Sequence, residues 1–276
     1  MSEPEEKRSP GRNLPIAIGV GLGLGGLVIV SLYTYKVIFL VVMGVFLCLG
    51  LRELTQAVAT RDIKTPFWPL VAGLVASLIA AYAWHTDGLI AAFTLTVLGL
   101  LVLRMLAGPE GYVRDTTASV FIAAYLALMG GVVALLLAAP DGNDRIVVFV
   151  AVTVASDIGG YFAGAFLGKH KMAPTISPKK TWEGFTGSAI TCMAVGGWLL
   201  CWLLGGAVWK GVLLGAAVVV AATLGDLIES MIKRDLGIKD MGTLLPEHGG
   251  VMDRLDSLLA TAPIVWLILE AFVPTT

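Results

Sequence analysis

Long apolar runs separated by short polar segments dominate the pattern of this 276-residue chain. Each run comes near the roughly 20 residues that a helix needs to cross a bilayer, although the second and the fourth are short. The runs extend over Leu14–Leu32, Val37–Leu51, Phe67–Trp84, Leu89–Leu103, Ala118–Ala139, Ile146–Leu167, Phe185–Leu204, Val212–Ile232 and Leu258–Val273. The pattern predicts an all-α fold, a polytopic membrane helix bundle with about nine transmembrane helices.

The basic residues between these runs indicate an orientation. If the N-terminus is cytoplasmic, all but three of the 19 Lys and Arg residues fall in cytoplasmic segments, and only Lys36, Arg145 and Lys210 fall outside. This agrees with the excess of positive charge that cytoplasmic loops of membrane proteins carry. We therefore expect a multi-pass protein of the cell membrane, with residues 168–184 and 233–256 on its cytoplasmic side.

Composition narrows the class of protein further. With 57% hydrophobic and 14% charged residues, the chain lies outside the range of soluble globular proteins. The three cysteines lie in apolar runs and suggest neither a disulfide framework nor a zinc site, and we expect no nucleic-acid partner. We divide the chain into a disordered cytoplasmic tail (1–13), N-terminal transmembrane helices (14–139) and a C-terminal transmembrane catalytic region (140–276). The glycine-rich first span permits close helix packing and a possible homodimer.

The segment from Gly225 to Asp256 concentrates charge in an otherwise apolar sequence. A helix over its first part places Asp226, Glu229, Ser230 and Lys233 on one face, because their spacing is i, i+3, i+4 and i+7. A loop follows, in which paired glycines next to His248 allow a positive φ or a close backbone approach. A solvent-exposed cytoplasmic loop would explain two isolated basic residues, but it would not explain acidic and basic residues mixed on an apolar helix.

A second polar segment begins at Asp157, about ten residues or roughly 15 Å from the cytoplasmic end of the sixth span. An ionised carboxylate there is costly, so either a polar cavity reaches it or it is a buried, paired Asp. Ser177 before Pro178 predicts a helix N-terminus, whose amides would form an anion site with Lys179 and Lys180. The alternative is that these lysines only hold the topology at the membrane interface.

The run from Ser230 to Asp256 resembles the signature of the phosphatidate cytidylyltransferases, or CDP-diacylglycerol synthases. It contains Ser-x-Ile-Lys-Arg, then Lys-Asp, and ends in His-Gly-Gly-Val-x-Asp-Arg-Leu-Asp. Residues 157–184 resemble a second polar block of that family, whereas the N-terminal half matches only in being hydrophobic. The resemblance implies that the phosphate of phosphatidic acid attacks the α-phosphorus of CTP, yielding CDP-diacylglycerol and pyrophosphate for phospholipid biosynthesis.

The residue types agree with this chemistry, because carboxylates and cations around one cavity suit metal-assisted nucleotidyl transfer. Oxygen ligands of this kind favour Mg²⁺, with a second cation possible. The expected metal ligands are Asp226 and Asp253, supported by Asp157 and Asp256. The expected catalytic residues are Asp226, Asp253, Lys233 and Arg254. The expected substrate-binding residues are Ser177, Lys179, Lys180, Ser230, Arg234, Lys239, His248, Gly249 and Gly250.

The sequence leaves two alternatives. A CTP-dependent polyprenol or lipid kinase would need similar triphosphate chemistry, together with a base that activates an uncharged alcohol. A cation-coupled transporter could also keep Asp157 and Asp226 in a cavity, but it would favour broken helices and charge on both sides of the site. Neither feature is visible in the sequence.

Overall fold

The computed structural model describes residues 14–242, 244 and 249–273, and over this part the chain is almost entirely helical. The predicted His248 and the N-terminal tail lie outside the described residues. The elements, in chain order, are α1 (Leu14–Thr34), α2 (Lys36–Ala59), α3 (Phe67–Leu106), α4 (Tyr112–Ile122), the π-helix η1 (Ala123–Leu128), α5 (Met129–Ala138), α6 (Gly142–Leu167), β1 (Lys171–Ala173), β2 (Ser177–Thr181), α7 (Trp182–Leu204), α8 (Val208–Leu236) and α9 (Met252–Phe272). The predicted all-α membrane bundle is confirmed.

Seven helices within the described residues are long and apolar enough to cross a membrane, counting α4, η1 and α5 as one. Helix α3 covers two predicted spans. Its backbone leaves the helical conformation at Trp84 and His85, where one predicted span ends before the next begins. Its two halves fold back on each other, since Gly73 of the first half lies against Thr96 of the second. In α1 the apolar stretch that can be described is only Gly25–Thr34. The count of nine spans therefore stays a prediction.

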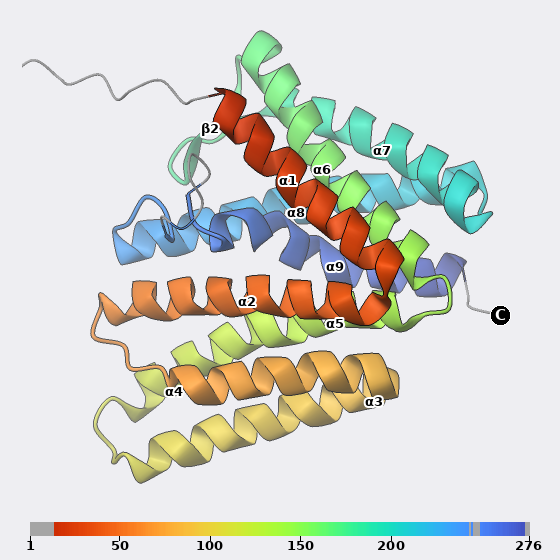
Figure 1. The fold of residues 1–276 in the computed structure, drawn as a ribbon. Helices are drawn as coiled ribbons and strands as arrows, with labels where there is room; N and C mark the ends of the chain where they lie inside the picture. The colour runs from red at the N-terminus through yellow and green to blue at the C-terminus, as the bar shows by residue number, and fades with distance from the viewer. Residues whose placement is uncertain (1–13, 243, 245–248, 274–276) are drawn as a thin grey trace, which may run out of the picture.

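The helices form two groups that meet at α9. In Figure 1, α2, α3, α4 and α5 lie together below, and α6, α7, α8 and α9 lie above. Helix α9 packs on α8 in its own group and on α5 and α2 in the other. A continuous apolar core joins the groups through Leu51, Leu126 and Leu259. The predicted division at residue 139 is not tested by this arrangement, but α9 places α2 next to the C-terminal region.

Helices α6 and α7 approach each other closely along a row of small residues. The Ser188 hydroxyl donates to the carbonyl of Ser156 at 2.6 Å, and the Thr191 hydroxyl donates to that of Ala155 at 2.8 Å. A Cβ atom on Gly160 would lie 2.5 Å from the Ser188 hydroxyl, so the helices could not pack this way with a larger residue there. Gly160, Gly164 and Gly168 recur every four residues along this side of α6, and the lack of side chains there allows α7 to lie close.

The two ends of the bundle carry different sets of charges. One end holds the α5–α6 connection and the end of α9, and three basic residues donate to backbone carbonyls there. Lys36 donates to the carbonyls of Ala139 and Pro140. Lys210 donates to the carbonyl of Phe272, and Arg145 to that of Val273. At the opposite end, Arg61 donates to the carbonyl of Asp235, and Arg234 to that of Ile176. Residues 168–184 and the described residues of 233–256 thus share one end of the bundle, and its assignment to the cytoplasm stays a prediction.

The expected helix start at Ser177 is wrong. Ser177–Thr181 is strand β2, which pairs antiparallel with β1 through Lys171 opposite Thr181 and Ala173 opposite Ser177. Helix α7 begins only at Trp182, where the Thr181 hydroxyl accepts a hydrogen bond from the Gly184 amide at 3.1 Å. The helix starts later than expected because residues 177–181 pair with β1. Thr181 is β-branched and extended, so it ends the strand and serves as the N-cap of α7.

Candidate active site

A cavity of about 330 Å³ opens between α6, the β1–β2 hairpin, α7 and α8. It is lined by Asp157 of α6, by Ser177, Lys179 and Lys180 of β2, and by Asp226 of α8. Asp157 is exposed to this space although it lies well inside α6. The polar cavity predicted to reach Asp157 is therefore present, and the strand rather than a helix N-terminus delivers its two lysines.

Lys180 and Asp226 form an ion pair inside this cavity. The Lys180 ammonium also donates to the carbonyl of Thr223, one helical turn earlier on α8, at 3.3 Å. The side chains keep 22% and 31% of their exposure, so both remain reachable from the cavity. The arrangement holds a fixed cation beside a carboxylate, which suits a ligand that carries several phosphates.

A second polar cluster surrounds Lys233, where α8 meets the start of α9. Its ammonium donates to Glu229 at 2.6 Å and to Asp253 at 2.8 Å. The side chains of Glu229 and Asp253 are only 2% and 8% exposed. Lys233 therefore joins two helices through two nearly buried carboxylates, an arrangement that is strongly destabilised if one partner is removed.

The backbone around the glycine pair holds Asp253 from the other side. The amides of Met241 and Gly250 donate to its Oδ2 atom at 3.1 and 2.8 Å. Gly249 has a φ of +80°, a conformation that favours glycine. The prediction of a glycine-dependent turn at this point is confirmed, and the turn delivers an amide to the Asp253 carboxylate.

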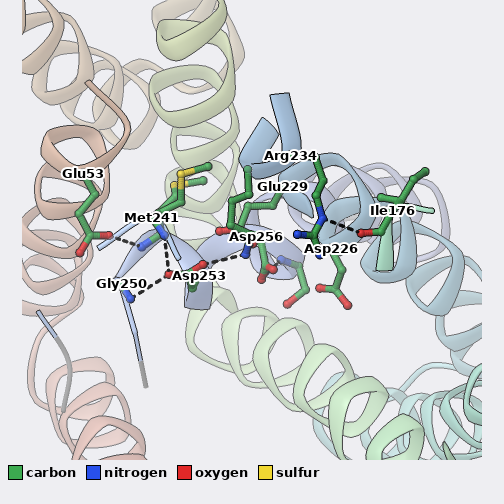
Figure 2. A network of polar contacts seen from close by, with 12 residues as sticks. Glu53, Ile176, Asp226, Glu229, Arg234, Met241, Gly250, Asp253 and Asp256 are labelled. Carbon is green, nitrogen blue, oxygen red and sulfur yellow. Dashed lines mark hydrogen bonds and ion pairs between the residues drawn. The ribbon is translucent and has the colours of Figure 1, made fainter. Parts of the chain in front are cut away.

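Asp256 connects the two clusters. It lies one turn after Asp253 on α9 and faces both Glu229 and Asp226. Figure 2 shows the resulting row of polar groups, which runs from Glu53 and Gly250 through Asp253, Glu229 and Asp256 to Asp226, with Arg234 and Ile176 beyond. Of the four predicted metal-ligand residues, Asp226, Asp253 and Asp256 thus lie in one row, and Asp157 lines the same cavity as Asp226.

The remaining predicted residues lie around this row. Ser230 is half-buried on α8, and Arg234 and Lys239 are exposed near its end. Arg234 fixes the tip of the hairpin by donating to the carbonyl of Ile176 at 3.4 Å. Arg254 is exposed on α9 and lies within electrostatic range of Asp157.

Three acidic residues of this region were not among the predicted site residues. Glu229 occupies the centre of the second cluster, and its helical spacing from Lys233 was the available signal. Glu183 accepts hydrogen bonds from the His170 ring at 2.6 Å and from the amides of Lys169 and His170, which fixes the chain before β1. Glu53 of α2 accepts from the amide of Met252 at 2.8 Å. It lies at the end of an apolar run, where a charge is ordinary, so no local signal marks it.

The donor set fits a hard divalent cation, because it consists of carboxylate oxygens. The Glu229 Oε1 atom is buried and accepts no hydrogen bond from a described residue, which leaves an oxygen available. Within the described ranges, however, no three His, Cys, Asp or Glu side chains converge in a metal-binding arrangement. Asp226 and Asp253 instead bind the ammonium groups of Lys180 and Lys233.

Comparison with known proteins gives consistent matches. Residues 16–272 match the sequence model of the cytidylyltransferase family. The phosphatidate cytidylyltransferase of Mycobacterium leprae is 39% identical over 275 residues, which covers 94% of this chain and 88% of the relative. That of Mycobacterium bovis is 35% identical over 277 residues, covering 96% and 90%. A Synechocystis protein of the same name is 41% identical over 140 residues, covering 49% of this chain and 46% of the relative.

Proposed function

Because the chain belongs to the cytidylyltransferase family, we propose that it catalyses the reaction of CTP with phosphatidic acid to give CDP-diacylglycerol and pyrophosphate. The observation that carries this proposal is the cavity in which Lys179, Lys180, Asp157 and Asp226 meet at one end of a membrane bundle. Such a site can hold a water-soluble triphosphate next to a lipid headgroup. The enzyme would serve phospholipid biosynthesis at the cytoplasmic face of the cell membrane.

The proposed reaction needs alignment and charge neutralisation more than proton transfer. A phosphate oxygen of phosphatidic acid forms a bond to the α-phosphorus of CTP, and the bond from that phosphorus to the bridging oxygen of the β-phosphate breaks. The nucleophile is already an anion, so a strong general base is unnecessary. Positioning and electrostatic stabilisation are then the main sources of rate acceleration.

The lysines of the cavity have the geometry for this task. Lys180 is held between Asp226 and the Thr223 carbonyl, so its ammonium is already ordered before a ligand arrives. Lys179 and Ser177 line the same cavity on β2. In the proposed role these groups bind the phosphates of CTP, and Asp226 keeps the lysine in place in the free enzyme.

The second cluster is proposed to act on the other side of the reacting phosphates. Lys233 and Arg254 would bind phosphate oxygens, together with Arg234 and Lys239 near the end of α8. Ser230, Gly249 and Gly250, with His248 beyond the described residues, would shape the pocket. Lys233 is the best supported of these, because two carboxylates and two helices fix its position.

A divalent cation, Mg²⁺ in the first place, is proposed as the cofactor, held by Asp226 and Asp253 with Asp157 and Asp256 in support. When bound, it would neutralise charge on the phosphates, because a triphosphate brought among several carboxylates meets strong repulsion. Excess EDTA should abolish turnover by the purified protein, and added Mg²⁺ should restore it. Full turnover in EDTA would exclude an obligatory cation.

The direct experiment supplies the purified protein with CTP and a panel of lipid acceptors. With phosphatidic acid, the proposal expects release of pyrophosphate and formation of a cytidine-containing lipid. A kinase would instead release CDP and pass phosphate to a polyprenol, and a transporter would show no turnover of CTP. The cations at the site favour an acceptor that arrives as a phosphate monoester over an alcohol that needs a base.

A further inference from the structure

Glu53 lies far from the C-terminal region in sequence but contacts the loop that holds Asp253. It belongs to α2, is 7% exposed, and accepts a hydrogen bond from the amide of Met252 through Oε2 at 2.8 Å. Met252 is the first residue of α9 and immediately precedes Asp253. The Glu53 carboxylate therefore binds the backbone at the point where the loop becomes the helix.

Two glycines of the same loop rest on this carboxylate. A Cβ atom on Gly250 would lie 2.6 Å from Glu53 Oε2 and 2.9 Å from Asp253 Oδ2. A Cβ atom on Gly242 would overlap with the Glu53 side chain, which supplies its three nearest atoms. The loop can approach Glu53 this closely only because both residues lack a side chain.

The contacts on the two carboxylates belong to one assembly. Asp253 accepts hydrogen bonds from the amides of Met241 and Gly250. Met241 directly precedes Gly242, and Gly250 lies two residues before Met252. Glu53 packs against Gly242 and Gly250 and binds Met252. Displacing the loop from Glu53 would therefore also displace the amides that orient Asp253 toward Lys233.

A purely packing role does not account for an acid at this position. The second oxygen of Glu53, Oε1, is buried and accepts no hydrogen bond from any residue in the described part of the chain. Burying an unsatisfied carboxylate oxygen costs free energy that an apolar side chain of similar size would avoid. Its benefit must then come from the hydrogen bond that it accepts at the loop.

We propose that Glu53 is a positioning residue of the active site: it fixes the loop and the helix start that precede Asp253, so that the N-terminal helices contribute to the geometry of catalysis. The proposal rests on the cytidylyltransferase function, because it concerns the rate of that reaction. It assigns α2 a role in a site whose other described members all come from α6 to α9.

Two substitutions of Glu53 separate the hydrogen bond from simple packing. Glu53→Gln keeps an acceptor oxygen in place, so its kcat should stay within about threefold of the original, whereas Glu53→Leu removes the acceptor and should lower kcat by roughly 10- to 100-fold. The Kd for CTP, measured by binding, should change less than kcat in both, because Lys179 and Lys180 line the cavity on β2 and not on this loop. Rates are compared per folded protein, with the thermal unfolding midpoint measured in the same detergent.

A double-mutant cycle with Gly242 tests the contact itself. Gly242→Ala should lower kcat strongly in the original protein, because the added methyl group overlaps with Glu53. It should cost much less in a Glu53→Ala background, where that overlap is gone, so the two effects should be non-additive. Gly99→Ala is the matched control, because a Cβ atom there meets nothing within 4 Å.

A readout without turnover keeps this test separate from the proposed function. A cysteine replacing Met241, which is 6% exposed, in a background without Cys48, Cys192 and Cys201, should react faster with a thiol reagent when Glu53→Leu frees the loop. Unchanged labelling and an unchanged kcat per folded Glu53→Leu protein would overturn the positioning role, as would additive effects in the cycle. If the original protein forms no cytidine-containing lipid, the proposed function fails, while the labelling still decides whether Glu53 fixes the loop.

Discussion

The two carboxylates that we propose for the reaction lie in different surroundings. Asp226 is paired with Lys180 in an open cavity and keeps 31% of its side-chain exposure. Asp253 is 8% exposed and binds Lys233 together with two backbone amides. A pair that solvent still reaches contributes less to stability than a buried pair, and breaking a buried pair leaves an uncompensated charge. Equal chemical changes at these residues should therefore have unequal effects on folding.

We predict that Asp226→Asn and Asp253→Asn each lower kcat by about 100-fold or more, because both remove charge from the site. Asp253→Asn should also lower the free energy of unfolding by roughly 3 kcal/mol. Asp226→Asn should change the free energy of unfolding by less than about 1 kcal/mol. Steady-state rates and unfolding in the same detergent measure the two effects.

Glu270→Gln provides the control for these substitutions. Glu270 also forms an ion pair, with Arg145 at 3.2 Å, but at the opposite end of the bundle and with 45% exposure. Its replacement should leave kcat unchanged. Near-normal rates in both aspartate variants would show that these carboxylates are structural partners of the lysines.

At the scale of elements, the start of α7 decides where the lysines of the cavity point. Thr181 ends β2, caps α7 through the Gly184 amide, and is 5% exposed. Its replacement by Ala would leave that amide unsatisfied inside the protein. The strand that carries Lys179 and Lys180 is thereby fixed to a helix at one end and to β1 along its length.

We predict that Thr181→Ala destabilises the protein by about 1 kcal/mol, the usual cost of losing an N-cap. Thr186→Ala is the matched control, because the Thr186 hydroxyl is exposed and donates to the carbonyl of Trp182 in its own helix. The thermal unfolding midpoint of Thr181→Ala should be lower than that of Thr186→Ala. A Thr181→Ala protein as stable as Thr186→Ala would contradict the capping role.

The long apolar runs of the sequence were sufficient to predict most helices but not the segments that connect them. The predicted runs fall on the observed helices because membrane spans are set by hydrophobic length. The hairpin before α7 was missed, since Ser177 and Pro178 also favour a helix N-terminus and only the pairing with β1 decides between the two. The glycine pair was recognised correctly, because a positive φ at Gly249 depends on local chemistry alone.

At the scale of the whole molecule, the site depends on contacts that span the sequence. Residues of α6, β2, α8 and α9 were grouped correctly from charge sorting and spacing. Glu53 was not, because its partner Met252 is 199 residues away and the charge at the end of α2 looks like an ordinary interfacial residue. No local pattern encodes a contact of this kind.

We predict that the two ends of the bundle face opposite sides of the membrane, as the sorting of Lys and Arg requires. In a cysteine-free background, a cysteine replacing Lys210 should react with an impermeant thiol reagent from outside intact cells. One replacing Lys239 should react only after permeabilisation. The reverse labelling would overturn the cytoplasmic assignment of the site.

The position of the phosphorus that enters the lipid tests the central claim most directly. Purified protein is given phosphatidic acid and CTP labelled either at the α- or at the γ-phosphorus. Cytidylyl transfer predicts that the α-label appears in the lipid and that the γ-label leaves as pyrophosphate, and that Asp226→Asn and Asp253→Asn reduce both. Transfer of the γ-label to a lipid, with the α-label left in CDP, would contradict the account.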